Sequence, residues 1–176
     1  HGDINQYSES PSGNFHGMYL RAIFDKFEIP EIDSLVPKKI LISNAFFIGN
    51  LDLDEGEKRY FNNNKIKTIN SNDLKKNKDE TLETFTKFIL KYKYLHVSFD
   101  ADVLDGKIFQ ATGIPATNGM SIEDVLALLE IISTHPNLSF DFSEFNPTKK
   151  SWEKWLELSK IIIKKPFMKA NRNQFD

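Results

Sequence analysis

Three aspartates crowd the end of one predicted strand. An apolar, β-type run over residues 94–97 is followed by Asp100, Asp102 and Asp105 within the next few positions. Carboxylates at the mouth of a core cost free energy unless they are neutralised, most simply by a hard divalent metal ion. The spacing therefore favours a metal site at the end of this strand.

The first residues of the chain offer further metal ligands. His1 and Asp3 are two positions apart, so in an extended segment both side chains point to the same side. An imidazole and a carboxylate in this arrangement are possible partners of the same metal site.

Composition fits one globular domain, with residues 168–176 as a loose tail. The chain has 176 residues, of which 40% are hydrophobic and 27% charged, and its formal net charge is −2. This near-balance favours neither nucleic acid nor a membrane as a partner, and no apolar run reaches membrane-spanning length. The chain has 0 cysteines, which excludes disulfides and thiolate metal sites and fits a cytoplasmic location.

Apolar β-type runs alternate with helical patterns, which is typical of a parallel α/β fold. We expect strands at 39–48, 65–69, 95–99 and 138–142, and helices at 54–61, 80–92 and 151–163 and after the capping residue Ser121. His96 is predicted to lie in the core, and His135, which precedes a proline, at a surface turn.

The polar residues follow the strands in a regular way. Asn50 and Asp52 come after the first expected strand, Asp100 and Asp102 after the third, and Glu144 after the fourth. Ligands of open α/β sheets bind at the carboxyl ends of parallel strands. We therefore expect these side chains to converge on one site.

Short motifs, taken in order, resemble those of the arginase (ureohydrolase) family. They lie at residues 1–5, 12–17, 98–102, 111–115 and 144–147, and the similarity extends to about residue 148. A series of motifs in one order is far more specific than any single motif. The resemblance implies a three-layer α/β/α fold with a mainly parallel sheet, a bridged pair of manganese ions, and hydrolysis of a guanidinium substrate.

The resemblance also implies roles for individual residues. His1, Asp3, Asp100 and Asp102 resemble manganese ligands, with Asp100 bridging both ions. His16 is similar to the acid/base histidine of the family, and Glu144 to the carboxylate that holds the guanidinium group. The implied substrate contacts are Asn5 and Ser12 for the α-carboxylate, Asp54 for the α-amino group, and Thr112 around the guanidinium.

The implied reaction agrees with the chemistry of these residue types. Guanidinium is a poor electrophile, and two cations that share one water lower the pKa of that water and direct it at the carbon. A carboxylate such as Glu144 matches the fork of N–H donors on a planar guanidinium. A histidine such as His16 titrates near neutral pH and can protonate the leaving amine.

This sequence departs from the family pattern at several points. The family's cluster has two histidines and four aspartates, and one histidine and one aspartate fall before the position of His1. We therefore expect this chain to be the carboxyl-terminal part of a longer enzyme and to lack a complete metal site alone. Gly106 replaces a usual proline, and Asn118 lies in a segment that is normally glycine-rich.

Other interpretations stay open. Asp100 and Asp102 can be turn or capping carboxylates, His16 a surface histidine, and Asp54 an acid at a helix N-terminus. Arginine is the favoured substrate because Asn5, Ser12 and Asp54 together suit an α-amino acid. The alternatives are a formimidoylglutamase or agmatinase activity, or a metal-free ureohydrolase-like binding module. Assembly into a homo-oligomer also stays open.

Overall fold

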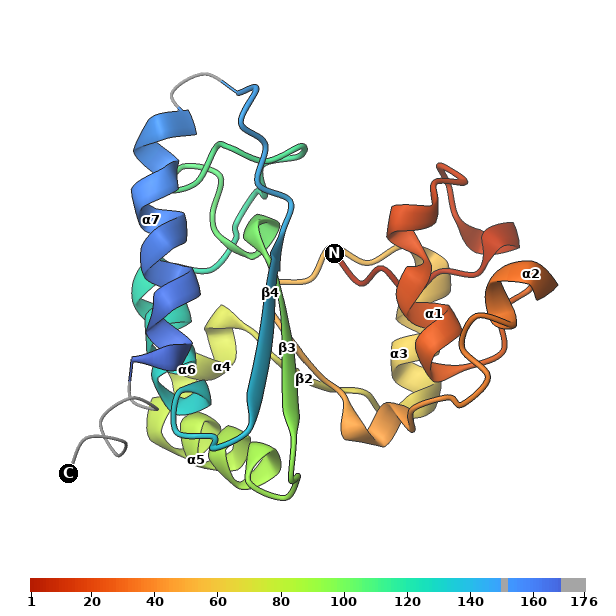
Figure 1. Ribbon diagram of the computed structural model, residues 1–176, viewed down its shortest axis with the longest axis horizontal. Coiled ribbons are helices and arrows are strands. Elements are labelled where there is room, and N and C mark those ends of the chain that lie inside the picture. Colours follow the sequence, from red (N-terminus) through yellow and green to blue (C-terminus); the bar gives the residue numbers. More distant parts are fainter. Residues whose placement is uncertain (150–151, 169–176) are drawn as a thin grey trace. The chain divides into compact units, whose positions relative to one another are not determined.

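The computed structural model describes residues 1–149 and 152–168, which form parallel α/β structure in two compact units, His1–Ile69 and Asn70–Asp176 (Figure 1). Most of the predicted tail after Met168 lies outside the described residues. No helix within these described ranges is both long and apolar enough to span a bilayer.

The first unit pairs two short parallel strands, with Phe46 opposite Lys67 and Ile48 opposite Ile69. Its strands are β1 (Phe46–Ile48) and β2 (Lys67–Ile69), and its helices are α1 (Tyr19–Phe24), α2 (Pro30–Asp33), α3 (Glu55–Asn64) and the 3-10 turns Tyr7–Glu9, Phe15–Gly17 and Ile42–Asn44. The core gathers around Ile4, Tyr60 and Phe61. Ile4 is fully buried, which anchors the amino-terminal segment in this core.

The second unit is built on a longer parallel pair, in which Leu95 lies opposite Leu138. Its strands are β3 (Leu95–Asp100) and β4 (Leu138–Ser143), and its helices are α4 (Ser71–Lys76), α5 (Lys78–Ile89), α6 (Ile122–Ile132), α7 (Trp152–Lys164) and the 3-10 turns Ala101–Val103 and Lys165–Phe167. Helices α6 and α7 lie on one side of the pair (Figure 1). Phe99 stacks on Phe142 with ring centroids 5.4 Å apart, and Phe99 is buried.

Several helix starts follow directly from local sequence. The Ser121 hydroxyl accepts a hydrogen bond from the Asp124 N–H at 3.1 Å, as expected of an N-cap residue. Asp54 and Glu57 form a capping box at the start of α3. Helix α4 begins at Ser71 and is capped by the side chain of Asn70, which accepts from the N–H groups of Asn72 and Asp73.

The strand predicted over residues 39–48 is wrong in its first half. The Ile40 N–H donates to the Ile23 carbonyl at 2.9 Å, and Lys39 Nζ donates to the Ala22 carbonyl at 2.8 Å. These bonds hold the segment against the end of α1 instead of a strand, and a 3-10 turn follows before β1 begins at Phe46.

The predictions for two histidines are both wrong. His96 is exposed because β3 alternates, with Phe99 facing the core and His96 on the opposite face. His135 is only 3% exposed. Its Nε2 lies 2.9 Å from the Tyr92 carbonyl oxygen, and its Nδ1 lies 3.2 Å from the Asn137 nitrogen, so the ring replaces water for buried backbone groups.

The two departures in the loop after β3 have a structural basis. A Cβ atom on Gly106 would lie 2.8 Å from the Ala116 carbonyl oxygen, so the turn depends on the missing side chain. Asn118 takes a φ of 63°, a left-handed conformation that asparagine tolerates better than most residues. Asparagine therefore meets a backbone requirement that glycine usually meets.

Candidate metal and substrate site

Two of the predicted site motifs meet at the carboxyl ends of β3 and β4. These strands are parallel, and Asp100 lies opposite Ser143, the last residue of β4. Glu144 directly follows Ser143 in the chain. The expectation that strand-end residues converge is confirmed for these two motifs. The local reason is the parallel register, which brings two carboxyl ends to one edge.

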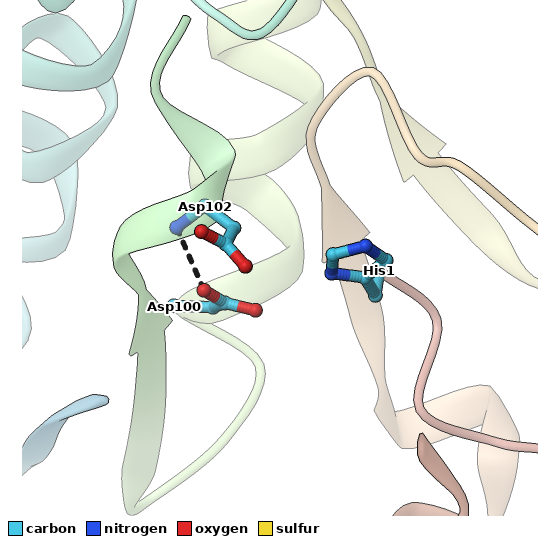
Figure 2. Close-up of side chains that lie close together, drawn as sticks. All are labelled: His1, Asp100 and Asp102. Atoms are coloured by element: carbon cyan, nitrogen blue, oxygen red, sulfur yellow. Dashed lines mark hydrogen bonds between the residues drawn. The ribbon is translucent and has the colours of Figure 1, made fainter. Parts of the chain in front are cut away.

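Asp100 and Asp102 lie on a tight turn at the end of β3 (Figure 2). The Asp102 N–H donates to Asp100 Oδ1 at 2.7 Å. Asp100 therefore has the turn and capping role that was one interpretation of the sequence. It leaves the second oxygen, Oδ2, for other partners, so capping does not exclude a ligand role.

Asp102 is buried, with 6% of its surface exposed. Burial, with smaller contributions from the charges of Asp100 and Glu144, raises the pKa of Asp102 to about 6, and the neighbouring Thr112 hydroxyl acts in the opposite direction. Thr112 is itself fully buried. A carboxyl group with this environment gains from a nearby cation, which would favour its ionised form.

Glu144 completes a group of three carboxylates in the second unit. It adopts a φ of 63°, a left-handed conformation that is rare for residues with a side chain. A Cβ atom on Gly113 would lie 3.8 Å from Glu144 Oε2, and the Asn146 N–H donates to the Ala111 carbonyl at 2.7 Å. The motifs at 111–115 and 144–147 are therefore joined in the structure.

The first unit holds the other predicted ligands, His1 and Asp3. His1 is exposed, and Asp3 is half-buried with a φ of 53°. Strained backbone at a residue that carries chemistry is common at functional sites. The four predicted ligands are thus divided between the two units, two in each, and the complete ligand set stays a prediction.

Asn5 and Asp54 are brought together in the first unit. Asn5 Nδ2 donates to Asp54 Oδ2 at 2.8 Å, and Asn5 is 3% exposed. Within the described part of the chain, the buried Asn5 Oδ1 has no hydrogen-bond partner. Both residues were predicted to bind substrate, and the structure adds that Asn5 orients Asp54.

Ser12 and His16 lie on an exposed segment. The Ser12 hydroxyl accepts from the Asn14 N–H at 3.2 Å, and His16 belongs to the 3-10 turn Phe15–Gly17. The Asn5 N–H donates to the Gly17 carbonyl at 3.3 Å. This bond connects the segment to the amino-terminal residues 3–5, which include the buried Ile4.

Two residues next to the proposed site, Arg21 and Glu57, received no role from the sequence. Glu57 is buried and accepts hydrogen bonds from the N–H groups of Ile4 and Asp54, both at 3.0 Å. Burial raises the pKa of this carboxyl group despite these two bonds. The spacing of Asp54 and Glu57 is a capping-box signal that could have indicated half of this role. The sequence holds no comparable signal for Arg21.

The donor chemistry fits manganese. Asp100 and Asp102 offer carboxylate oxygens next to each other, and His1 and Asp3 offer an imidazole and a carboxylate. Carboxylate oxygens suit magnesium, calcium and manganese. The chemistry of these donors therefore fits the binuclear manganese that is typical of the family that the motifs resemble.

The two parallel strand pairs, with carboxylates at the carboxyl ends of β3 and β4, define an α/β protein. The chain belongs to the arginase family, whose model matches residues 1–162. The family resemblance carried by the short motifs is thereby confirmed.

Curated relatives show the same relationship. Arginase of Staphylococcus aureus (strain COL) is 35% identical over 153 residues, which cover 84% of this chain and 50% of that protein. Arginase of Entamoeba histolytica is 31% identical over 149 residues, with the same coverage of 84% and 50%. This chain spans about half the length of the curated relatives it matches.

Solved structures confirm the arginase-like α/β fold. The crystal structure of Entamoeba histolytica arginase in complex with L-ornithine has a TM-score of 0.84 at 28% identity, and the match covers 96% of this chain and 57% of that one. Native arginase from Bacillus caldovelox has a TM-score of 0.86 at 26% identity, again covering 96% and 57%.

Proposed function

We propose that the protein containing this chain is a manganese-dependent hydrolase that cleaves the C–N bond of a guanidinium substrate, converting arginine and water into ornithine and urea. The observation that carries the proposal is the crowding of Asp100, Asp102 and Glu144 at the ends of β3 and β4. Membership of the arginase family supports the reaction class.

The proposed metal ligands are His1, Asp3, Asp100 and Asp102. A bound manganese pair would supply an acidified water at the guanidinium carbon. Asp100 Oδ1 holds the Asp102 N–H, which keeps the two carboxylates on one turn.

The proposed substrate contacts come from both units of the chain. Glu144 binds the N–H fork of the guanidinium group, and Thr112 packs beside it. Asp54 binds the α-ammonium group, while Asn5 and Ser12 face the α-carboxylate. The hydrogen bond from Asn5 to Asp54 supports this assignment because it fixes the direction of the Asp54 carboxylate.

His16 is the proposed proton donor. When the C–N bond breaks, the side-chain nitrogen of ornithine leaves as an amine and needs one proton. An imidazole can deliver it near neutral pH. The exposure of His16 on a short turn is consistent with access to a bound substrate.

One assay separates the candidate reactions. The full-length protein, loaded with Mn²⁺, is given arginine, agmatine or formimidoylglutamate, and urea and formamide are measured. Urea from arginine above the agmatine and blank controls supports the proposal. Formamide from formimidoylglutamate without urea would instead establish formimidoylglutamase activity.

A second measurement addresses the metal-free alternative. Metal analysis of the full-length protein should find about two manganese ions per subunit. A full-length protein that binds no manganese would be a ureohydrolase-like binding module. The cytoplasmic location and the homo-oligomer stay predictions.

A further inference from the structure

Four backbone groups of the segment from Asp3 to Asn5 have hydrogen-bond partners. The Asp3 carbonyl accepts from the Leu20 N–H at 3.1 Å, and the Asn5 N–H donates to the Gly17 carbonyl at 3.3 Å. Between them, the Ile4 N–H donates to Glu57 Oε1 at 3.0 Å, and the Ile4 carbonyl accepts from Arg21 Nε at 2.7 Å. The peptide groups on both sides of Ile4 are therefore held by charged side chains.

This segment carries strain. Asp3 has a φ of 53°, a left-handed conformation that is rare for residues with a side chain. Such a conformation persists only when its surroundings over-determine it. Arg21 and Glu57 act on the residue that directly follows Asp3, and both are buried.

Arg21 is the better candidate for a dedicated role, because Glu57 also serves as a cap for α3. The guanidinium carbon of Arg21 lies 3.7 Å from the centroid of the Tyr60 ring, and its Nη2 lies 3.6 Å from Glu9 Oε2. A buried guanidinium needs such partners to offset its desolvation. Because it is planar, the group can stack on a ring while it donates in its plane.

Glu9 extends the network to the surface. Its Oε1 accepts from Arg59 Nη2 at 2.9 Å, and Arg59 is largely exposed. A Cβ atom on Gly56 would lie 2.9 Å from the Glu9 Cβ and 3.1 Å from Asn5 Oδ1. Glu9 thus packs closely against the first turn of α3, next to Asn5.

We propose that Arg21 is a positioning residue that holds the Ile4 carbonyl and thereby sets the backbone of Asp3 and Asn5 for their ligands. The inference rests on the proposed function, in which Asp3 is a manganese ligand and Asn5 a substrate contact. Arg21 itself does not touch metal or substrate; it acts through the Ile4 peptide.

The test uses the full-length protein with Arg21→Met, which keeps the length of the apolar stem and removes the guanidinium. Manganese affinity is measured by titration with free Mn²⁺ followed by electron paramagnetic resonance, and KM and kcat are measured from urea release. Arg21→Met should weaken manganese binding by about 10-fold or more, the scale on which supporting groups act. It should also raise KM for arginine. Arg21→Lys should restore only part of either loss, because an ammonium lacks the planar fork.

Two controls isolate the proposed contact. Arg59→Met removes the other guanidinium on Glu9 without touching Ile4, and it should keep manganese affinity and KM within about 2-fold. Phe27→Leu perturbs the separate core cluster around Met18 and Ala22. It should lower the unfolding temperature without changing manganese affinity.

The outcomes are distinct. Normal manganese affinity and normal KM in Arg21→Met would overturn the inference alone. The inference would also be overturned if Phe27→Leu had the same unfolding temperature as Arg21→Met and lost as much manganese affinity. A wild-type protein that neither binds Mn²⁺ nor releases urea would overturn the proposed function, and this inference with it.

Discussion

Asn5 and Asp54 are 49 positions apart in the chain, yet the Asn5 amide donates to the Asp54 carboxylate at 2.8 Å. The bond joins the buried amino-terminal strip to the start of α3. It also means that Asp54 has two duties, as the N-cap of a helix and as a proposed substrate contact. The two duties can be separated by experiment, because only the second requires a negative charge.

Asp54→Asn should weaken binding of arginine while the fold is kept. Asparagine caps helices about as well as aspartate, but it has only one oxygen and cannot also accept from the Asn5 amide. The free energy of unfolding should therefore fall by about 1 kcal/mol, the scale of one hydrogen bond. Loss of a charged hydrogen bond to the α-ammonium should raise KM by about 10-fold or more. Kinetics and thermal unfolding check both parts, with the exposed Glu55→Gln as the matched control. An unchanged KM would leave Asp54 with the capping role only.

Asp100→Asn should remove manganese. The asparagine Oδ1 can still accept from the Asp102 N–H, so the turn is preserved while the negative charge is lost. Loss of a residue that only orients a metal ligand lowers activity by about 10–100-fold. Loss of the ligand Asp100 itself should lower activity by more than that. Metal analysis provides the direct measurement. Asp105→Asn is the control, since Asp105 accepts from the Lys107 N–H in a similar turn at 2.8 Å. Full manganese content in Asp100→Asn would refute the ligand assignment.

Glu144→Gln should leave manganese bound and impair substrate binding. The amide keeps one oxygen acceptor but places N–H groups against the guanidinium fork, so KM for arginine should rise by about 10-fold or more. Metal analysis and urea release are measured on the same preparation, with Glu123→Gln on α6 as an exposed control. If Glu144→Gln also loses manganese, Glu144 is a metal ligand and not only a substrate contact.

Asp33 should make the stability of the first unit depend on pH. Lys39 Nζ and the Phe27 N–H donate to Asp33 Oδ1 at 2.6 Å and 2.8 Å. These bonds keep the pKa of Asp33 below its ordinary value of 3.8, and the bond from Lys39 has the largest effect. A carboxyl group whose pKa is lowered in the folded state stabilises the protein above its unfolded pKa. That stabilisation is lost as the pH falls through the folded pKa.

Asp33→Asn should therefore be less stable than the wild type at pH 7, and the difference should shrink as the pH falls below 3.8. Urea unfolding at several pH values measures it, with the exposed Glu31→Gln as control. A difference that stays constant across this range would contradict the role of the Asp33 charge.

Much of the architecture could be predicted because it depends on local patterns. The apolar alternation of β3 and β4, the Ser121 cap of α6, and the order of the site motifs are all properties of neighbouring residues. Failures came where a partner distant in sequence decides the outcome. The segment at 39–42 is as apolar as a strand, but bonds to Ile23 and Ala22 hold it against α1.

The candidate site divides in the same way. Its residue types and their spacing were sufficient to indicate a metal, because donor chemistry is a property of the side chains themselves. The guanidinium substrate was indicated only by the resemblance of the motifs to the arginase family. Burial, backbone strain and the bonds at Ile4 were decided only when α1 and α3 packed against the amino-terminal segment. Arg21 illustrates the difference: in the sequence it is one arginine in a short helix, and in the folded unit it is a buried cation on the Ile4 carbonyl, because its partners come from three separate segments.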